Sequence, residues 1–63
     1  MPCKIRVGIK ESYFQIAKEI LQKDEKELNS KIRKNWIFFK VTWAEYTNLR
    51  KEIHGQNIYI NEE

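Results

Sequence analysis

Trp36-Ile37-Phe38-Phe39-Lys40-Val41-Thr42 is the stretch that decides the fold of this 63-residue chain. It is rich in aromatic and β-branched residues, which favour strands. Successive side chains of a strand point to opposite faces of a sheet. The stretch therefore divides into an inward set and an outward set, Ile37, Phe39 and Val41 against Trp36, Phe38 and Lys40.

Two other segments alternate in the same way and predict two further strands. Residues 3–10 carry apolar side chains at every second position, and so do residues 57–61. Gly8 is isolated within the first of these segments. A single glycine in a strand indicates a bulge or the close approach of another element, here the first helix.

Residues 11–28 are predicted to form an amphipathic helix. Ser12 and Gln15 have the spacing of a capping box, in which two side chains bond the free N–H groups of the first turn. The apolar stripe resumes at Leu28, and the helix is expected to end near Asn29. Its buried face has the spacing of three and four residues that a helix requires, in Tyr13, Ile16, Ala17, Ile20 and Leu21.

A second, shorter helix is predicted at residues 43–53. Thr42 and Glu45 repeat the capping-box spacing. Gly55 stands where a helix often ends in a left-handed residue. The apolar face of this helix would consist of Trp43, Tyr46, Leu49 and Ile53.

The elements follow one another as β-α-β-α-β in a single domain, residues 1–63, of the α/β (α+β) class. The first and third predicted strands alternate apolar and polar side chains, as strands with one buried face do. Both helices are therefore expected to cover the same face of a three-stranded sheet. Right-handed crossovers would give a sequential strand order, and the third strand is left open as parallel or antiparallel. The expected core is Ile5, Val7, Ile9, Ile16, Ala17, Ile20, Leu21, Ile37, Phe39, Val41, Tyr46, Leu49, Ile53, Ile58 and Ile60.

The other face of the sheet is expected to be open, aromatic and basic. A chain this small seldom exposes contiguous aromatic surface unless that surface binds something. We therefore predict a binding site there, made of the outward side chains of all three strands: Trp36, Phe38, Lys40, Lys4, Arg6 and Tyr59.

The sequence leaves open which partner covers this face. Two copies could stack through Trp36, Phe38 and Tyr59, because oligomerisation stabilises so small a core. Another protein could dock on the face or on a sheet edge. Single-stranded nucleic acid or a nucleotide could stack on the rings while Lys and Arg bind phosphates. The last pattern resembles the sheets of RNA-recognition-motif domains, although their glycine-aromatic motif is absent.

Few residues of the chain suit catalysis. Cys3 and His54 are the single cysteine and histidine, and the predicted elements place them at opposite ends of the domain. Nucleophilic catalysis needs a base within hydrogen-bond reach of its nucleophile. Without a Cys/His cluster or a cofactor motif, we expect no metal, no cofactor and no enzymatic activity.

The layout of the chain resembles the small 4-oxalocrotonate-type tautomerases. Shared features are Met1-Pro2, a leading strand, a helix near residue 12 and a strand near residue 37. That family uses an N-terminal proline as general base in a hexamer, so the resemblance implies this role for Pro2. The chain departs from the family near its end, where it predicts a helix at 43–53 in place of a Gly-rich hairpin. Lys10 is a loose counterpart of the cationic residue that follows the family's first strand.

We therefore predict a small non-catalytic binding module, a regulator or inhibitor that engages a protein partner or itself as a homodimer. Binding of single-stranded nucleic acid is the alternative, favoured by a net charge of +3 whose excess lies in residues 1–34, with nine Lys or Arg against five Asp or Glu. No apolar run approaches the roughly 18 residues that span a membrane. The lone cysteine favours the cytoplasm. Richness in Lys, Glu, Ile and Asn suggests a phage or mobile element.

Overall fold

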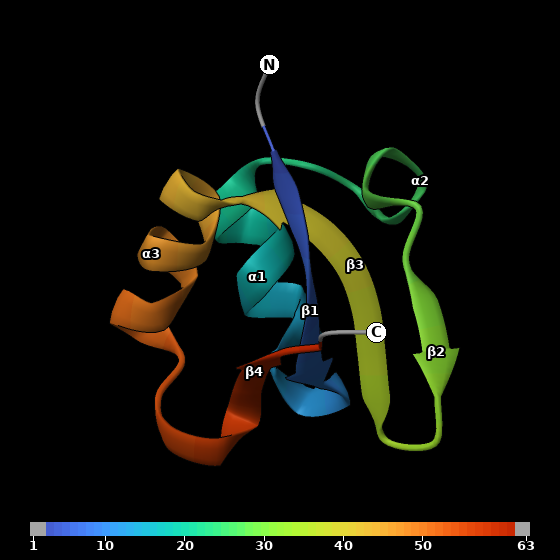
Figure 1. Ribbon diagram of the computed structural model, residues 1–63. Coiled ribbons are helices and arrows are strands. Elements are labelled where there is room, and N and C mark those ends of the chain that lie inside the picture. The colour runs from blue at the N-terminus through green and yellow to red at the C-terminus, as the bar shows by residue number, and fades with distance from the viewer. Residues whose placement is uncertain (1–2, 62–63) are drawn as a thin grey trace.

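Four strands form one antiparallel sheet in the computed structural model, which describes residues 3–61 (Figure 1). Their order across the sheet is β2-β3-β1-β4, so β1 and β3 lie at the centre. The strands are β1 (Lys4–Lys10), β2 (Lys31–Arg33), β3 (Trp36–Thr42) and β4 (Ile58–Ile60). The strand predicted at residues 36–42 is confirmed with these bounds.

Three helices connect the strands. They are α1 (Phe14–Leu21), α2 (Glu25–Leu28) and α3 (Trp43–Glu52), with short 3-10 turns η1 (Glu11–Tyr13) and η2 (Gly55–Asn57). The main elements run β1-α1-β2-β3-α3-β4, the split β-α-β arrangement, with the one-turn helix α2 added before β2. In Figure 1, α1 lies next to and behind β1, α3 lies on the far side of α1 at the left, and α2 lies beyond one end of β2. The fold is α+β, but it has four strands rather than the three predicted.

The added strand β2 directly follows the segment that the sequence predicted as one long helix. Gln22 directly follows α1 and ends it, because it adopts a left-handed conformation with φ of 57°. Asp24 and Glu27 then form a capping box that starts α2, and Asn29, with φ of 53°, ends it. The single helix over residues 11–28 was therefore wrong, because two left-handed residues turn the chain within and just after that range.

The two predicted helix starts have different outcomes. At Thr42 the capping box is confirmed: Glu45 N–H donates to the Thr42 hydroxyl at 3.2 Å, and Thr42 N–H donates to the Glu45 carboxylate at 2.9 Å. Ser12 caps nothing, because it lies inside the 3-10 turn η1 and the N-cap of α1 is Tyr13. The chain enters α1 through that turn, so the expected start at Ser12 was wrong.

The core lies between the inward face of the sheet and the two longer helices. Its strand residues were predicted, but the buried face of α1 was not placed correctly. Ile16 is 40% exposed, whereas Phe14 is buried and packs its ring 5.9 Å from that of Phe39. Ile20 is only half-buried. The described core comprises Val7, Ile9, Phe14, Ala17, Leu28, Ile37, Phe39, Val41, Leu49, Ile53 and Ile58.

The last strand adds to the outer edge of β1 rather than continuing the sheet in sequence order. Val7 pairs with Ile60 and Ile9 with Ile58, both in antiparallel register. The pairing left open by the sequence is thus antiparallel, and the sequential strand order was wrong. Among the helices of residues 3–61, none is both long and apolar enough to cross a membrane.

Glu45 links the start of α3 to the α1–α2 connection and gives the fold a defined acid sensitivity. Its pKa lies below the usual value because the backbone N–H of Thr42 donates to the carboxylate and Lys23 forms a salt bridge with it at 3.1 Å, which together outweigh partial burial. A lowered pKa means that Glu45 stabilises the fold fully above its unfolded-state pKa of about 4.3. This contribution is lost as the pH falls through the lower folded-state pKa.

We expect the Glu45→Gln variant to unfold at lower urea concentration than the original chain at pH 7. The difference between the two midpoints should shrink as the pH falls from 5 toward 3, since the original chain then loses the same charge. Urea titrations followed by circular dichroism measure both midpoints. A difference that stays constant over this pH range would contradict the assignment of the effect to ionised Glu45.

Candidate functional site

The outward face of the sheet brings together all six residues that the sequence assigned to the binding site. Residues directly opposite each other on paired strands share a face. Lys4 pairs with Thr42, Arg6 with Lys40 and Gly8 with Phe38 between β1 and β3. On the other side of β1, Gly8 pairs with Tyr59. The alternation that buries Ile37, Phe39 and Val41 therefore turns Trp36, Phe38, Lys40, Lys4, Arg6 and Tyr59 to the opposite side.

Two cations of the unpredicted strand β2 lie on the same face. Lys31 pairs with Phe38, and Arg33 with Trp36, between β2 and β3. They were missed because residues 29–35 were not recognised as containing a strand. The alternation Lys31-Ile32-Arg33 before the turn at Lys34 was the signal that could have shown it.

The charge of this face is of one sign. The four strands contain six Lys or Arg residues and no Asp or Glu. By strand register all six cations point outward: Lys4, Arg6, Lys10, Lys31, Arg33 and Lys40. Every carboxylate side chain of the described chain belongs to a helix, turn or connection instead. Such a face attracts anions, because clustered like charges sum to a field that a single ion pair does not produce.

Three rings form a cluster on the same face, here called the aromatic platform: Trp36, Phe38 and Tyr59. The ring of Tyr59 meets that of Trp36 edge-on, with centroids 5.0 Å apart, and that of Phe38 edge-on at 6.3 Å. The Lys10 ammonium lies 5.6 Å from the Trp36 ring centre. Tyr59 is 38% exposed, and the other two rings are half-buried. The rings thus support one another and still present surface to solvent.

Gly8 makes the platform possible. A Cβ at this position would lie 2.8 Å from ring atoms of both Phe38 and Tyr59, closer than real Cβ contacts come. The β1–β3 register runs through Gly8 without an inserted residue, so the expected bulge is absent from this strand. The close approach that the glycine indicated is that of two rings on the open face, and not that of the first helix.

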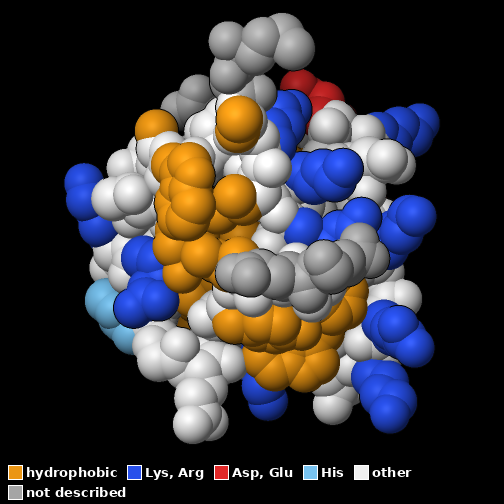
Figure 2. Space-filling view, in the orientation of Figure 1, with side chains coloured by type: hydrophobic (Ala, Val, Ile, Leu, Met, Phe, Trp, Pro, Cys, Tyr) orange, Lys and Arg blue, Asp and Glu red, His pale blue; other side chains and the backbone are white. Residues whose placement is uncertain are grey.

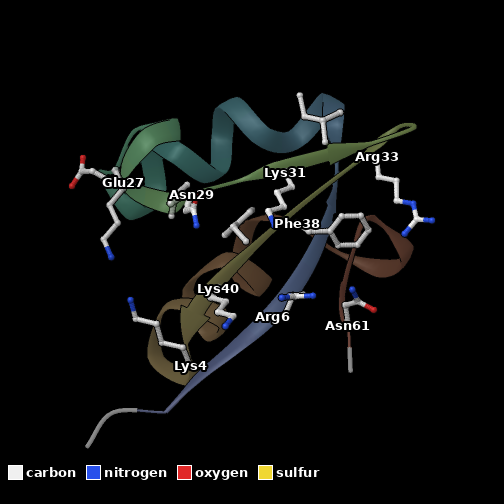
Figure 3. A pocket seen from close by; sticks show the side chains of 13 residues that line it. Lys4, Arg6, Glu27, Asn29, Lys31, Arg33, Phe38, Lys40 and Asn61 are labelled. Atoms are coloured by element: carbon white, nitrogen blue, oxygen red, sulfur yellow. The ribbon is translucent and has the colours of Figure 1, made fainter. Parts of the chain in front are cut away.

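A groove of ≈ 700 Å³ lies beside the platform, on the side toward β2 and α2 (Figure 3). Its lining is mainly cationic, and Glu27 contributes the carboxylate. We call it the basic groove; its charged and amide side chains are Lys4, Arg6, Lys23, Glu27, Asn29, Lys31, Arg33, Lys40 and Asn61. Phe38 lies in its wall, so the groove and the platform share this ring. In Figure 2, Lys and Arg side chains gather over the same side of the molecule.

The structure assembles no catalytic set from the residues it describes. Cys3 is exposed and precedes β1, whereas His54 follows α3 shortly before Ile58, which pairs with Ile9 at the other end of β1. Within residues 3–61, no three His, Cys, Asp or Glu side chains are grouped so that they could hold a metal ion. Pro2, to which the tautomerase resemblance assigns the role of base, lies outside the described residues.

The geometry of this face suits binding. It offers a row of cations for anionic groups and, beside them, a set of rings for flat apolar groups. No family model, curated protein or solved structure matches the chain.

Proposed function

We propose that this protein binds single-stranded nucleic acid on the open face of its sheet. One observation carries the proposal: six Lys or Arg residues, with no carboxylate in the strands, share a face with three aromatic rings. Phosphates and bases are the two groups that such a face would bind together, since cations follow the backbone and rings stack on bases.

The same charge argues against stacking two copies through this face. Each copy would bring six cations and no strand carboxylate into the interface, and like charges juxtaposed at an interface cost several kcal/mol. The homodimer predicted from the size of the chain would need another surface. A regulatory protein partner stays a prediction, and for this face it would have to be acidic.

A single strand suits the platform better than a duplex. In a duplex the bases are stacked on one another, whereas unpaired bases can be splayed out onto aromatic side chains. Phe38 lies on the central strand β3 and Tyr59 on the edge strand β4, on either side of Gly8. The rings are therefore placed for a flexible strand that crosses the sheet.

We expect the protein to bind a short labelled oligothymidylate in fluorescence anisotropy at 50 mM salt. The affinity should fall linearly on a logarithmic salt scale, with a slope of about −0.7 for each phosphate contacted. The same protein should bind a duplex of equal length, and a polyglutamate of equal charge, more weakly. Each stacked base is worth about 1–3 kcal/mol, or about 5- to 150-fold in affinity.

The comparison of these three ligands distinguishes binding of single-stranded nucleic acid from nonspecific attraction to any polyanion. Equal affinity for oligothymidylate, duplex and polyglutamate would mean that the rings make no contribution and that the face binds any polyanion. Absence of binding to the single strand at 50 mM salt would overturn the proposal.

A further inference from the structure

We infer that the basic groove holds successive phosphodiester groups of the bound strand, so that the nucleic-acid backbone runs between the α2–β2 segment and the central strands. The bases of the same nucleotides then lie on the aromatic platform. This inference rests on the proposed function and adds to it a path for the strand across the sheet.

The register spaces the cations of the groove along a line and across it. Arg6 and Lys40 face each other on neighbouring strands, which lie about 4.8 Å apart. Lys31 lies opposite Phe38, which precedes Lys40 by two residues on β3. Along the strand direction, Lys31 is therefore about 6.6 Å from the level of Lys40. Arg33 follows Lys31 by another such step. The groove thus offers a repeating row of cations, which matches a polymer of phosphates better than one small anion.

Four cations of the groove lack a carboxylate partner among residues 3–61. Lys23 is engaged by Glu45 at 3.1 Å, at the α2 end of the groove. Lys4, Lys31, Arg33 and Lys40 form no ion pair with any carboxylate of residues 3–61. Glu27 lines the groove, but its carboxylate accepts the backbone N–H of Asp24 in the capping box of α2. Phosphates would supply the missing counter-charge.

The wall formed by α2 and β2 is held in place without a ligand. Leu28 is buried in the core, and the salt bridge of Lys23 ties the preceding turn to α3. Asn29, left-handed with φ of 53°, turns the chain from α2 toward β2, whose Ile32 pairs with Ile37. A preformed groove binds without the cost of ordering a loop, which raises affinity.

Phe38 connects the two parts of the site. It lines the groove, and its ring centre lies 6.3 Å from that of Tyr59 on the platform. Figure 3 shows it between Lys31 and Arg33 of β2 on one side and Arg6 of β1 on the other. A base stacked on Phe38 would therefore keep its own phosphate within reach of the groove cations, which orients the strand with its backbone toward β2 and its bases toward β4.

The test measures phosphate contacts and base stacking separately. In a Trp43→Phe background, Trp36 is the single tryptophan, so quenching of its fluorescence reports a base on the platform. The Lys31→Ala/Arg33→Ala variant should lose two phosphate contacts. Its salt slope should shrink by about 1.4, and its affinity for oligothymidylate at 50 mM salt should fall on the order of 60-fold. Quenching at saturation should remain.

Two controls accompany this variant. Arg50→Ala/Lys51→Ala removes the same two residue types from exposed positions on α3 and should leave the slope unchanged. An abasic phosphodiester of equal length should bind the original chain with the same slope but without quenching. Should the β2 variant fail the check of folding by circular dichroism, Lys40→Gln on β3 serves in its place, with a slope change of about 0.7.

The outcomes distinguish the inference from the proposed function. If the original chain does not bind oligothymidylate, the proposed function fails and the path fails with it. If it binds, but the groove variant keeps the original slope, the path is wrong while the function stands. A change of slope in the α3 control as large as that in the groove variant would also overturn the path, because the phosphates would then follow the helices.

Discussion

Replacing Phe39 with alanine is expected to unfold most of the molecule. Phe39 is 3% exposed, and its ring packs 5.9 Å from that of Phe14 across the interface between β3 and α1. Truncation of a buried Phe to Ala costs about 3–5 kcal/mol, through lost transfer energy and the cavity left behind. A domain of this length has a total stability of roughly 3–9 kcal/mol. Thermal melts followed by circular dichroism should show a lost or strongly lowered transition.

Phe38→Ala is the matched control, since it removes the same ring from the next position of the same strand. Phe38 points to the open face and is half-buried there. The variant should stay folded, with a smaller loss of stability, and should bind oligothymidylate about 5- to 150-fold more weakly through loss of a stacking surface. If Phe38→Ala unfolds as fully as Phe39→Ala, the ring belongs to the core of the monomer and the assignment of the platform is wrong.

Replacing Gly8 with alanine is expected to damage binding without removing any charge or ring. The new Cβ would stand 2.8 Å from Phe38 and Tyr59 ring atoms, so the rings must move off the strand. Overpacking of this kind costs about 1–3 kcal/mol of stability. Because the displaced rings no longer present their surface to a base, the affinity for oligothymidylate should fall by an amount similar to that of Phe38→Ala. Anisotropy and urea unfolding on the same sample measure both effects.

Gly55→Ala controls for the loss of a glycine as such. A Cβ at Gly55 meets nothing within 4 Å, but its φ of 66° makes the substitution strained, by about 1–2 kcal/mol. This variant should therefore be destabilised and yet bind oligothymidylate like the original chain once folded. A Gly8→Ala variant that also kept the original affinity would show that the platform does not contact the ligand.

Local patterns predicted the elements whose signals lie within a few residues. The alternation at residues 36–42 and the capping box of Thr42 and Glu45 both appear in the structure. Both depend on neighbours in sequence, the first through the two faces of a strand and the second through bonds that span three residues. The outward placement of Trp36, Phe38 and Lys40 followed from the same alternation.

The parts that could not be predicted depend on contacts between distant residues or on unusual backbone angles. Gln22 is left-handed although it is not a glycine, so no residue type marked the end of α1. Ile16 fits the apolar spacing of a helix as well as Phe14 does, and only the position of Phe39 decides which one is buried. No local signal places β4 beside β1, because that pairing joins the two most distant strands.

The residues of the candidate site were predicted where their strand was predicted, and were missed where it was not. Lys4 and Arg6 were assigned correctly to the face that carries Trp36, since β1 was recognised. Lys31 and Arg33, which extend the site into a groove, lie after the predicted helix in a short segment that was not recognised as a strand. Because this three-residue strand was not predicted, two of the six groove cations were left out of the predicted site.

The position of β1 has a consequence for how the protein is made. This strand is synthesised first but lies inside the sheet, and it needs β3 on one side and β4 on the other. Val7 pairs with Ile60, so one edge of β1 stays open until β4 has left the ribosome. An open strand edge is a template for aggregation, and pairings this distant form slowly. A chain in which residues 58–60 have not yet docked therefore exposes this edge of β1, and it is in that state that the protein is most prone to aggregate.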